Sequence, residues 1–173
     1  MSTLVNLNEY PYAEAPTTRG RQAGMSEIRS LDQHVGFMLA VARARVLRAV
    51  NACLADHGLH ARSYSALALA CQREGVSQRE LSEELQLDPS QIVAIVDGLE
   101  AAGWVERQVS KADRRIRAVV ATPQGREKHR TAAQEVATVE DELLAVLQED
   151  ERQALLYLLT RIVHGDRAHQ LNK

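Results

Sequence analysis

Aromatic residues are scarce in this sequence of 173 residues, which contains one tryptophan, one phenylalanine and four tyrosines. Proteins that bind single-stranded nucleic acid stack successive bases on aromatic side chains. A chain with so few aromatic residues is therefore not expected to bind nucleic acid in that way. Double-stranded DNA remains open, because arginine, lysine and helices can read it through its grooves.

Cysteines and long apolar runs are scarce as well. Cys53 and Cys71 are too few for a disulfide scaffold, and both lie in apolar helical text that is typical of buried thiols. No apolar run approaches the roughly 18 to 20 residues that a membrane span requires. The N-terminus lacks the basic and then apolar segments of a signal peptide. We therefore expect a cytoplasmic protein with no membrane segment, built as one domain with an extension.

Motifs for catalysis and for metal binding are also missing. The sequence contains no phosphate-binding loop, no nucleophile elbow and no cluster of metal ligands. Of the six histidines, His57 and His60 are close in sequence, but no cysteine–histidine group has the spacing of a tetrahedral zinc site. We expect no enzyme activity, no cofactor and no bound metal.

Periodic apolar residues are abundant, and they recur at the three- and four-residue steps of helices. They predict helices over about 31–56, 63–73, 78–85, 89–102, 122–147 and 149–166. Two helix starts carry the signature of a capping box, Ser77 with Glu80 and Asp88 with Gln91, and Pro89 suits a first helical position. Residues 1–27 hold no sustained periodicity and are expected to be a flexible N-terminal extension.

The helices at 78–85 and 89–102 are joined by a tight turn, which is typical of a helix-turn-helix. Residues 104–109 and 116–121 are rich in β-branched side chains and predict a hairpin directly after it. The expected fold class is therefore mainly α with a small β-hairpin wing. Residues 61–122 form the winged helix-turn-helix, and residues 28–60 and 123–168 form a helical dimerisation region, because their apolar stripes exceed what one small domain can bury.

The hairpin carries a cluster of positive charge in a chain whose formal net charge is -2. Between residues 105 and 117, five basic residues stand against Glu106 and Asp113. The five are Arg107, Lys111, Arg114, Arg115 and Arg117. A wing tip can reach a flanking minor groove or the DNA backbone, so we predict DNA contacts for these residues. The alternative is an ordinary solvated turn.

The second helix of the pair is the predicted reading helix. Ser90, Gln91 and Ala94 face outward near its start, where residues of such helices reach base edges. Gln91 can pair with adenine, Ser90 can serve base or phosphate, and Ala94 can only touch a thymine methyl group. The alternative is that Ser90 and Gln91 merely form the first helical turn, with Gln91 used in its own cap.

The stretch LDPSQIVAIVDGLEAAGWVERQVSKADRRIRAVVATPQG, residues 87–125, resembles the MarR family of bacterial transcriptional regulators. The match rests on the aspartate–arginine wing of Asp113 and Arg114, followed by Thr122 and Gly125. The resemblance implies a homodimer on a pseudo-palindromic DNA operator, usually a repressor that a small phenolic or other aromatic effector releases. It also implies major-groove contacts for the reading helix, a minor-groove contact for Arg115, and an arginine-orienting role for Asp113.

The sequence departs from the family pattern at three positions. Ala94 and Gly98 stand where relatives often hold a basic residue, so more of the affinity is expected from the wing. Gly36 stands where one branch of the family holds a peroxide-sensing cysteine, so that mechanism is not supported. The family effector pocket lies between the dimer helices and the winged helix, and its candidate lining residues here are His34, Phe37, Arg43 and Tyr64. Ordinary packing is the alternative for these residues.

Two other functions remain open at this point. A winged helix can serve as a protein-interaction module rather than a DNA reader. A thiol-based redox response through Cys53 or Cys71 would make the protein a redox-responsive regulator.

Overall fold

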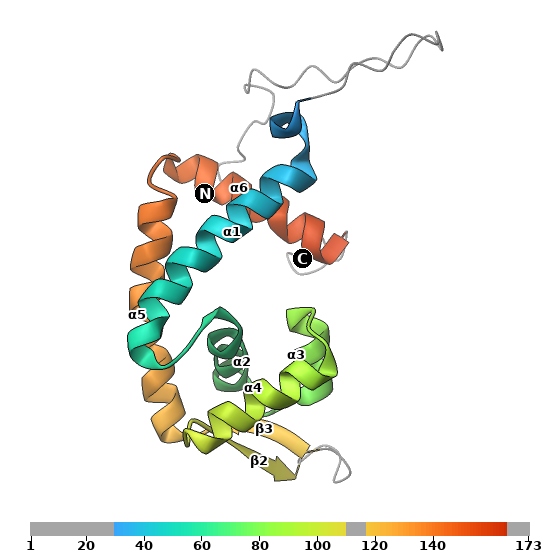
Figure 1. Ribbon diagram of the computed structural model, residues 1–173, viewed down its shortest axis with the longest axis vertical. Helices are drawn as coiled ribbons and strands as arrows, with labels where there is room; N and C mark the ends of the chain where they lie inside the picture. The colour runs from blue at the N-terminus through green and yellow to red at the C-terminus, as the bar shows by residue number, and fades with distance from the viewer. Residues whose placement is uncertain (1–29, 110–116, 166–173) are drawn as a thin grey trace, which may run out of the picture. The chain divides into compact units, whose positions relative to one another are not determined.

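A computed structural model describes residues 30–109 and 117–165, which fall into two compact units. The described part of the larger unit, residues 35–143, holds five α-helices, the 3-10 helix Ala55–His57 and a three-stranded sheet (Figure 1). Its helices are α1 (Val35–Leu54), α2 (Ala61–Gln72), α3 (Gln78–Leu85), α4 (Pro89–Ala101) and α5 (Pro123–Leu143), and its strands are β1 (Val76–Ser77), β2 (Val105–Val109) and β3 (Arg117–Ala121). The smaller unit contains the 3-10 helix Leu31–Gln33 and α6 (Glu149–His164).

The predicted helices are all present; α3 has the predicted ends, and the others differ from the prediction at one or both ends. The first and fifth are shorter than predicted, since α1 begins at Val35 and α5 ends at Leu143. The second spans Ala61–Gln72 rather than 63–73. Within the described residues, no helix combines the length and the apolar character that crossing a membrane would need.

The predicted hairpin is confirmed, and β2 and β3 pair antiparallel with Val105 opposite Ala121 and Val109 opposite Arg117. A third strand, β1, was not predicted. Val76 of β1 pairs with Val119 on the other side of β3, which gives the order β1-β3-β2. Two residues are too short for any periodicity, so this strand left no sequence signal. In the order β1-β3-β2, β2 is an edge strand.

The start of α3 confirms one capping box, and the start of α4 corrects the other. The Ser77 hydroxyl accepts from the Glu80 amide at 3.1 Å, and the Glu80 carboxylate accepts from the Ser77 amide at 2.7 Å. The predicted box of Asp88 with Gln91 is wrong, because the Asp88 side chain makes no capping hydrogen bond. The Gln91 amide donates instead to the backbone carbonyl of Asp88 at 3.0 Å, which satisfies that donor.

The core of the larger unit lies where α1 ends and α2, α3 and α4 meet. Its largest fully buried side chains include Leu54, Leu67, Leu81, Ile92 and Val96, one or two from each of these helices. Each buried side chain of this size contributes roughly 1.5–3 kcal/mol relative to an exposed one. One face of α4 is therefore fixed to the interior of the unit.

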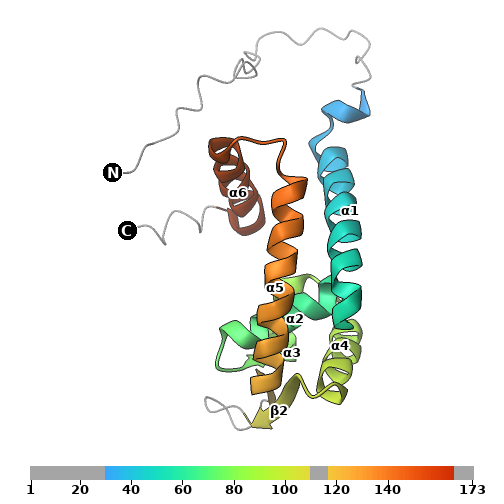
Figure 2. The same cartoon turned by 90° about the vertical axis from the view of Figure 1, so that its left-hand side faces the viewer.

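The helices α1 and α5 lie side by side and run in opposite directions, as Figures 1 and 2 both show. Just after the end of α1, His57 Nε2 lies 2.9 Å from Glu135 Oε1 of α5. Nearer the start of α5, His129 stacks on Tyr64 of α2, with ring centroids 5.5 Å apart. These contacts join α5 to the segment between α1 and α2 and to α2 itself.

Apolar side chains on α1 and α6 remain exposed. The first half of α1 exposes its predicted stripe, with Val35 69% and Met38 47% accessible. No residue of α6 is buried, and Leu156, Ile162 and Val163 are each more than 60% accessible. Monomeric proteins rarely leave such continuous apolar surfaces uncovered. Each surface is suited to contact another protein chain.

Gly125 generates a stability prediction. A Cβ placed on this residue would lie 1.9 Å from the Trp104 carbonyl oxygen, closer than two non-bonded heavy atoms can approach. Gly125→Ala is expected to lower the free energy of unfolding by about 1–3 kcal/mol or more, because backbone must move to admit the methyl group. Gly98→Ala is the control: its Cβ meets no atom within 4 Å, so helix propensity should stabilise the protein by about 1 kcal/mol. Equal denaturation midpoints for both variants would contradict the close approach.

Candidate nucleic-acid interface

The outward face of α4 is exposed along the length of the helix. Ser90, Gln91 and Ala94 are exposed as predicted. Asp97, Gly98 and Ala101 continue the same face and are exposed too. Most of these side chains are small, so a second surface can approach the helix backbone closely. Sequence reasoning missed Val93, which is 42% exposed beside them and is the sort of apolar group that contacts a thymine methyl.

The wing is described only up to its tip. Arg117 is exposed at the first position of β3, opposite Val109. The residues Lys111, Asp113, Arg114 and Arg115 lie outside the described residues. Their predicted DNA contacts, and the predicted role of Asp113 in orienting an arginine, stay predictions.

Arg107 sits in the middle of β2 and is engaged within the chain. Its Nη2 donates to Asp97 Oδ1 at 2.5 Å, and its Nη1 donates to Glu100 Oε2. Its backbone amide donates to the other Glu100 oxygen at 3.1 Å. Burial opposes the positive charge, but the hydrogen bonds to the two carboxylates outweigh it and raise the pKa of Arg107. The predicted DNA contact of Arg107 stays untested, and its surroundings are not those of a free wing arginine.

A joint at Thr122 connects the end of α4, the start of β2 and the start of α5. The Thr122 hydroxyl donates to the Gly103 carbonyl at 2.8 Å and accepts from the Gly125 amide at 3.0 Å, which caps α5 as predicted. The Thr122 amide donates to the Trp104 carbonyl at 3.0 Å. Gly103, with φ of 73°, ends α4 in the predicted left-handed conformation. The joint positions the wing against the reading helix.

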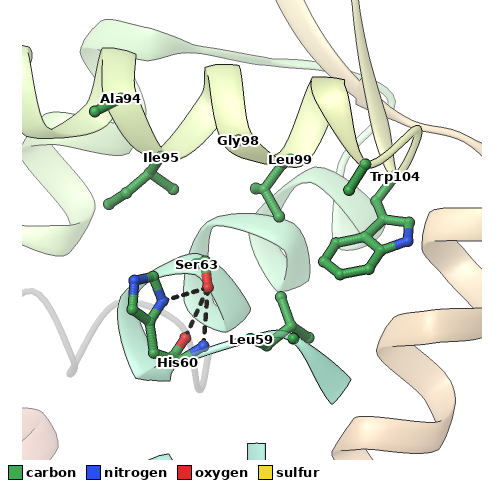
Figure 3. A pocket seen from close by; sticks show the side chains of 10 residues that line it. Leu59, His60, Ser63, Ala94, Ile95, Gly98, Leu99 and Trp104 are labelled. Carbon is green, nitrogen blue, oxygen red and sulfur yellow. Dashed lines mark hydrogen bonds between the residues drawn. The ribbon is translucent and has the colours of Figure 1, made fainter. Parts of the chain in front are cut away.

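A cavity of about 340 Å³ lies beneath α4 and beside the start of α2 (Figure 3). Its wall is mostly apolar and includes Leu59, Ile95, Leu99 and the Trp104 ring, with Gly58, Ala94, Gly98 and Ala102. Two polar side chains, His60 and Ser63, also line it, and His60 Nδ1 lies 2.6 Å from Ser63 Oγ. A cavity of this size and lining suits a flat, mainly apolar molecule with a polar substituent.

Comparisons with known proteins agree with this geometry. A family model described as MarR family matches residues 57–116. The crystal structure of CouR from Rhodococcus jostii RHA1 bound to p-coumaroyl-CoA is 36% identical, with a TM-score of 0.74, and the match covers 79% of this chain and 96% of that chain. A transcriptional regulator (MarR family) from Rhodococcus sp. RHA1 matches with the same identity and coverage and a TM-score of 0.75. The chain belongs to the MarR family of transcriptional regulators.

Among curated proteins, the HTH-type transcriptional regulator TtmR of Methylorubrum extorquens (strain PA1) is 31% identical over 105 residues. The match covers 61% of this MarR-family chain and 54% of TtmR, so the chain spans about half the length of that relative. The mainly helical fold with a small antiparallel sheet, predicted from the sequence, is confirmed by both the structure and these neighbours.

The structure does not bring the four predicted effector residues of this MarR-family chain together around the cavity. None of His34, Phe37, Arg43 and Tyr64 lines it. His34, Phe37 and Arg43 are exposed, and Tyr64 packs on His129. The cavity lies within the winged helix itself. Its polar residues, His60 and Ser63, were not predicted from the sequence, because a gap between α2 and α4 leaves no pattern in the sequence.

The thiols of this regulator are poorly suited to redox sensing. Both cysteines are free. Burial, together with the charge of Glu135, raises the pKa of Cys53, and burial raises the pKa of Cys71 against the opposing effect of Arg126. A raised pKa leaves less of the reactive thiolate at neutral pH. Within the described part of the chain, histidine, cysteine, aspartate and glutamate side chains form no group of three or more that could hold a metal ion.

The stack of His129 on Tyr64 generates a prediction about pH. Burial lowers the pKa of His129 below its usual value, so the folded protein favours the neutral ring. The unfolded chain then binds a proton more readily, and the melting temperature should fall as the pH drops below about 6.5. In His129→Gln this acid-dependent fall should be smaller, as measured by thermal unfolding between pH 7 and pH 5. The same pH dependence in both proteins would assign the acid sensitivity to other groups.

Proposed function

We propose that the protein is a homodimeric, sequence-specific regulator that binds double-stranded DNA, acts as a repressor in the cytoplasm and has no enzymatic activity. The observation that carries this proposal is the division of α4 into two faces. Ile92, Val96 and Leu99 anchor one face in the core, while Ser90, Gln91 and Ala94 stand exposed on the other. A helix held in this way can enter a major groove as a rigid body.

The wing supplies the second contact in this proposal. Arg117 and the basic tip, residues 110–116, would reach the minor groove or phosphates next to the site of α4. CouR, 33% identical to this chain and matched over 95% of its length, has been solved bound to a 23-mer DNA duplex, which supports binding of double-stranded DNA here.

Dimerisation would cover the exposed apolar surfaces. The stripes on α1 and α6 lie toward the two ends of the chain, within the regions 28–60 and 123–168 that the sequence assigns to the dimer. A two-fold dimer places its two reading helices on half-sites about one helical turn, or roughly 10 bp, apart. We therefore expect an inverted repeat as the operator.

A small aromatic effector would bind in the cavity beneath α4. Ala94 and Gly98 belong both to the cavity wall and to the exposed face of α4. A molecule in the cavity therefore touches the helix that reads DNA and can shift it. CouR, which has been solved with p-coumaroyl-CoA, supports a ligand with an aromatic group.

The DNA-binding prediction concerns Arg115. Duplexes selected from a random pool by the purified protein should share an inverted repeat. On that duplex, Arg115→Ala should weaken binding by about 1–3 kcal/mol and reduce the salt slope by about 1 if a phosphate is lost. Arg130→Ala is the control, because this exposed arginine of α5 pairs with Glu127. Fluorescence anisotropy at several salt concentrations measures both quantities.

The outcomes separate the candidate functions. Unchanged affinity and salt slope in Arg115→Ala would remove this residue from the interface. Weak binding with no shared motif, in folded and dimeric wild-type protein, would favour the alternative of a protein-interaction module.

The effector prediction uses p-coumaroyl-CoA as the probe. If the compound releases wild-type protein from its operator, His60→Phe should need about tenfold more of it, because a hydrogen bond to a polar group is lost. His34→Phe is the matched control, since His34 is exposed and does not line the cavity. Loss of the response in His34→Phe alone would favour the residues predicted from sequence. No response in wild type would exclude this compound as the effector.

A further inference from the structure

Arg107 joins three elements of the winged helix through one guanidinium group. We infer that Arg107 is a positioning residue that fixes the wing to the reading helix, and that it does not contact DNA. The inference rests on the proposed DNA-binding function and concerns how that function is achieved. Asp97 and Glu100 on α4 are the main partners of Arg107, and Gln78 at the start of α3 is the third.

Two of the three guanidinium nitrogens donate to carboxylates, and the third faces the side-chain amide of Gln78. Nη1 donates to Glu100 and Nη2 donates to Asp97. With the oxygen of the Gln78 amide turned toward the guanidinium, that oxygen accepts from Nη2 at 3.0 Å and from Nε at 3.1 Å. The planar fork of arginine fits such a set of acceptors, whereas a lysine ammonium would not. Only 20% of the Arg107 side chain is exposed, so little of it faces a possible phosphate.

The charges within the cluster also argue against a phosphate contact. One guanidinium faces two carboxylates, so the three side chains together carry a charge of about -1 at neutral pH. A negative cluster repels a DNA phosphate. Arg107 instead neutralises Asp97, which lies on the exposed face of α4 and would otherwise present an unpaired negative charge to the DNA.

The backbone shows why the contact controls the wing. Because β2 is an edge strand, one side of it has no neighbouring strand to accept its amide hydrogens. The Arg107 amide donates to Glu100 Oε1 at 3.1 Å, so α4 takes the place of that strand. Three residues later the chain enters the wing tip. The cluster of Gln78, Asp97, Glu100 and Arg107 therefore fixes β2, the strand that leads into residues 110–116, against α4.

Holding both DNA-contacting elements at a fixed angle lowers the ordering cost of binding, because neither element must be immobilised separately. Loss of Arg107 or of one of its carboxylate partners should therefore weaken DNA binding. This holds even for a carboxylate, although its loss removes a negative charge. Simple electrostatics predicts the opposite for a carboxylate near DNA. This difference in sign makes the inference testable.

The experiment compares Arg107→Gln, Glu100→Gln and the double variant on the selected operator duplex. A positioning role predicts that each single variant binds roughly tenfold more weakly, that the double variant is no weaker than Arg107→Gln, and that the salt slope stays unchanged. Arg107→Lys should not restore affinity, because it keeps the charge but loses the fork. Arg79→Gln is the matched control, since Arg79 pairs with Glu83 on the exposed surface of α3.

A direct DNA contact by Arg107 would give a different pattern. Glu100→Gln would then bind DNA as tightly as wild type or more tightly, Arg107→Gln would lose about one unit of salt slope, and Arg107→Lys would retain most of the affinity. Any of these results would overturn the inference.

A second measurement needs no DNA. Amide hydrogen exchange in β2 should be faster in both single variants of the free protein, and no faster in the double variant than in Arg107→Gln. Exchange at the wild-type rate in Arg107→Gln would overturn the positioning role. Failure of wild-type protein to bind any duplex would instead overturn the proposed function, and the exchange rates would still decide the role of Arg107.

Discussion

The burial of one side of α4 is the constraint on which the rest of the winged helix depends. Ile92, Val96 and Leu99 must reach the core formed by α2 and α3, and this fixes the rotation of the helix about its axis. Once the rotation is fixed, Ser90 and Ala94 can only point outward. The exposed face proposed to read DNA is thus a result of packing on the opposite side of α4, so a substitution in the core would reorient that face even though no residue on it is replaced.

Local signals in the sequence predicted the helices and the hairpin well. Ser77 and Glu80 cap α3 as their spacing indicates, and Gly103 and Thr122 stop and start helices as expected. These features depend on residues a few positions apart, so a linear pattern contains them. The capping box predicted at Asp88 is absent because the Gln91 amide, which the Asp88 side chain would have bonded, donates to the Asp88 backbone carbonyl instead.

Features that join distant segments were not predictable. The strand β1 exists only because Val76 meets Val119, 43 residues later. The cavity brings His60 and Ser63 against α4, and the partners of Arg107 come from both α3 and α4. Charge counting placed Arg107 in one basic cluster with the wing tip, since composition does not show which arginine already has a carboxylate beside it.

The backbone and the side chain of Trp104 make separate sets of contacts. Its backbone meets Gly125 and Thr122 at the joint, while its ring lines the cavity and lies 5.3 Å from the ammonium of Lys128. Any residue at this position supplies the same backbone carbonyl. Replacement of the tryptophan can therefore reshape the cavity while the joint persists, whereas position 125 permits no such variation. The side chain at position 104 can in this way vary with the shape of the cavity, while the backbone connection between α4, β2 and α5 stays the same.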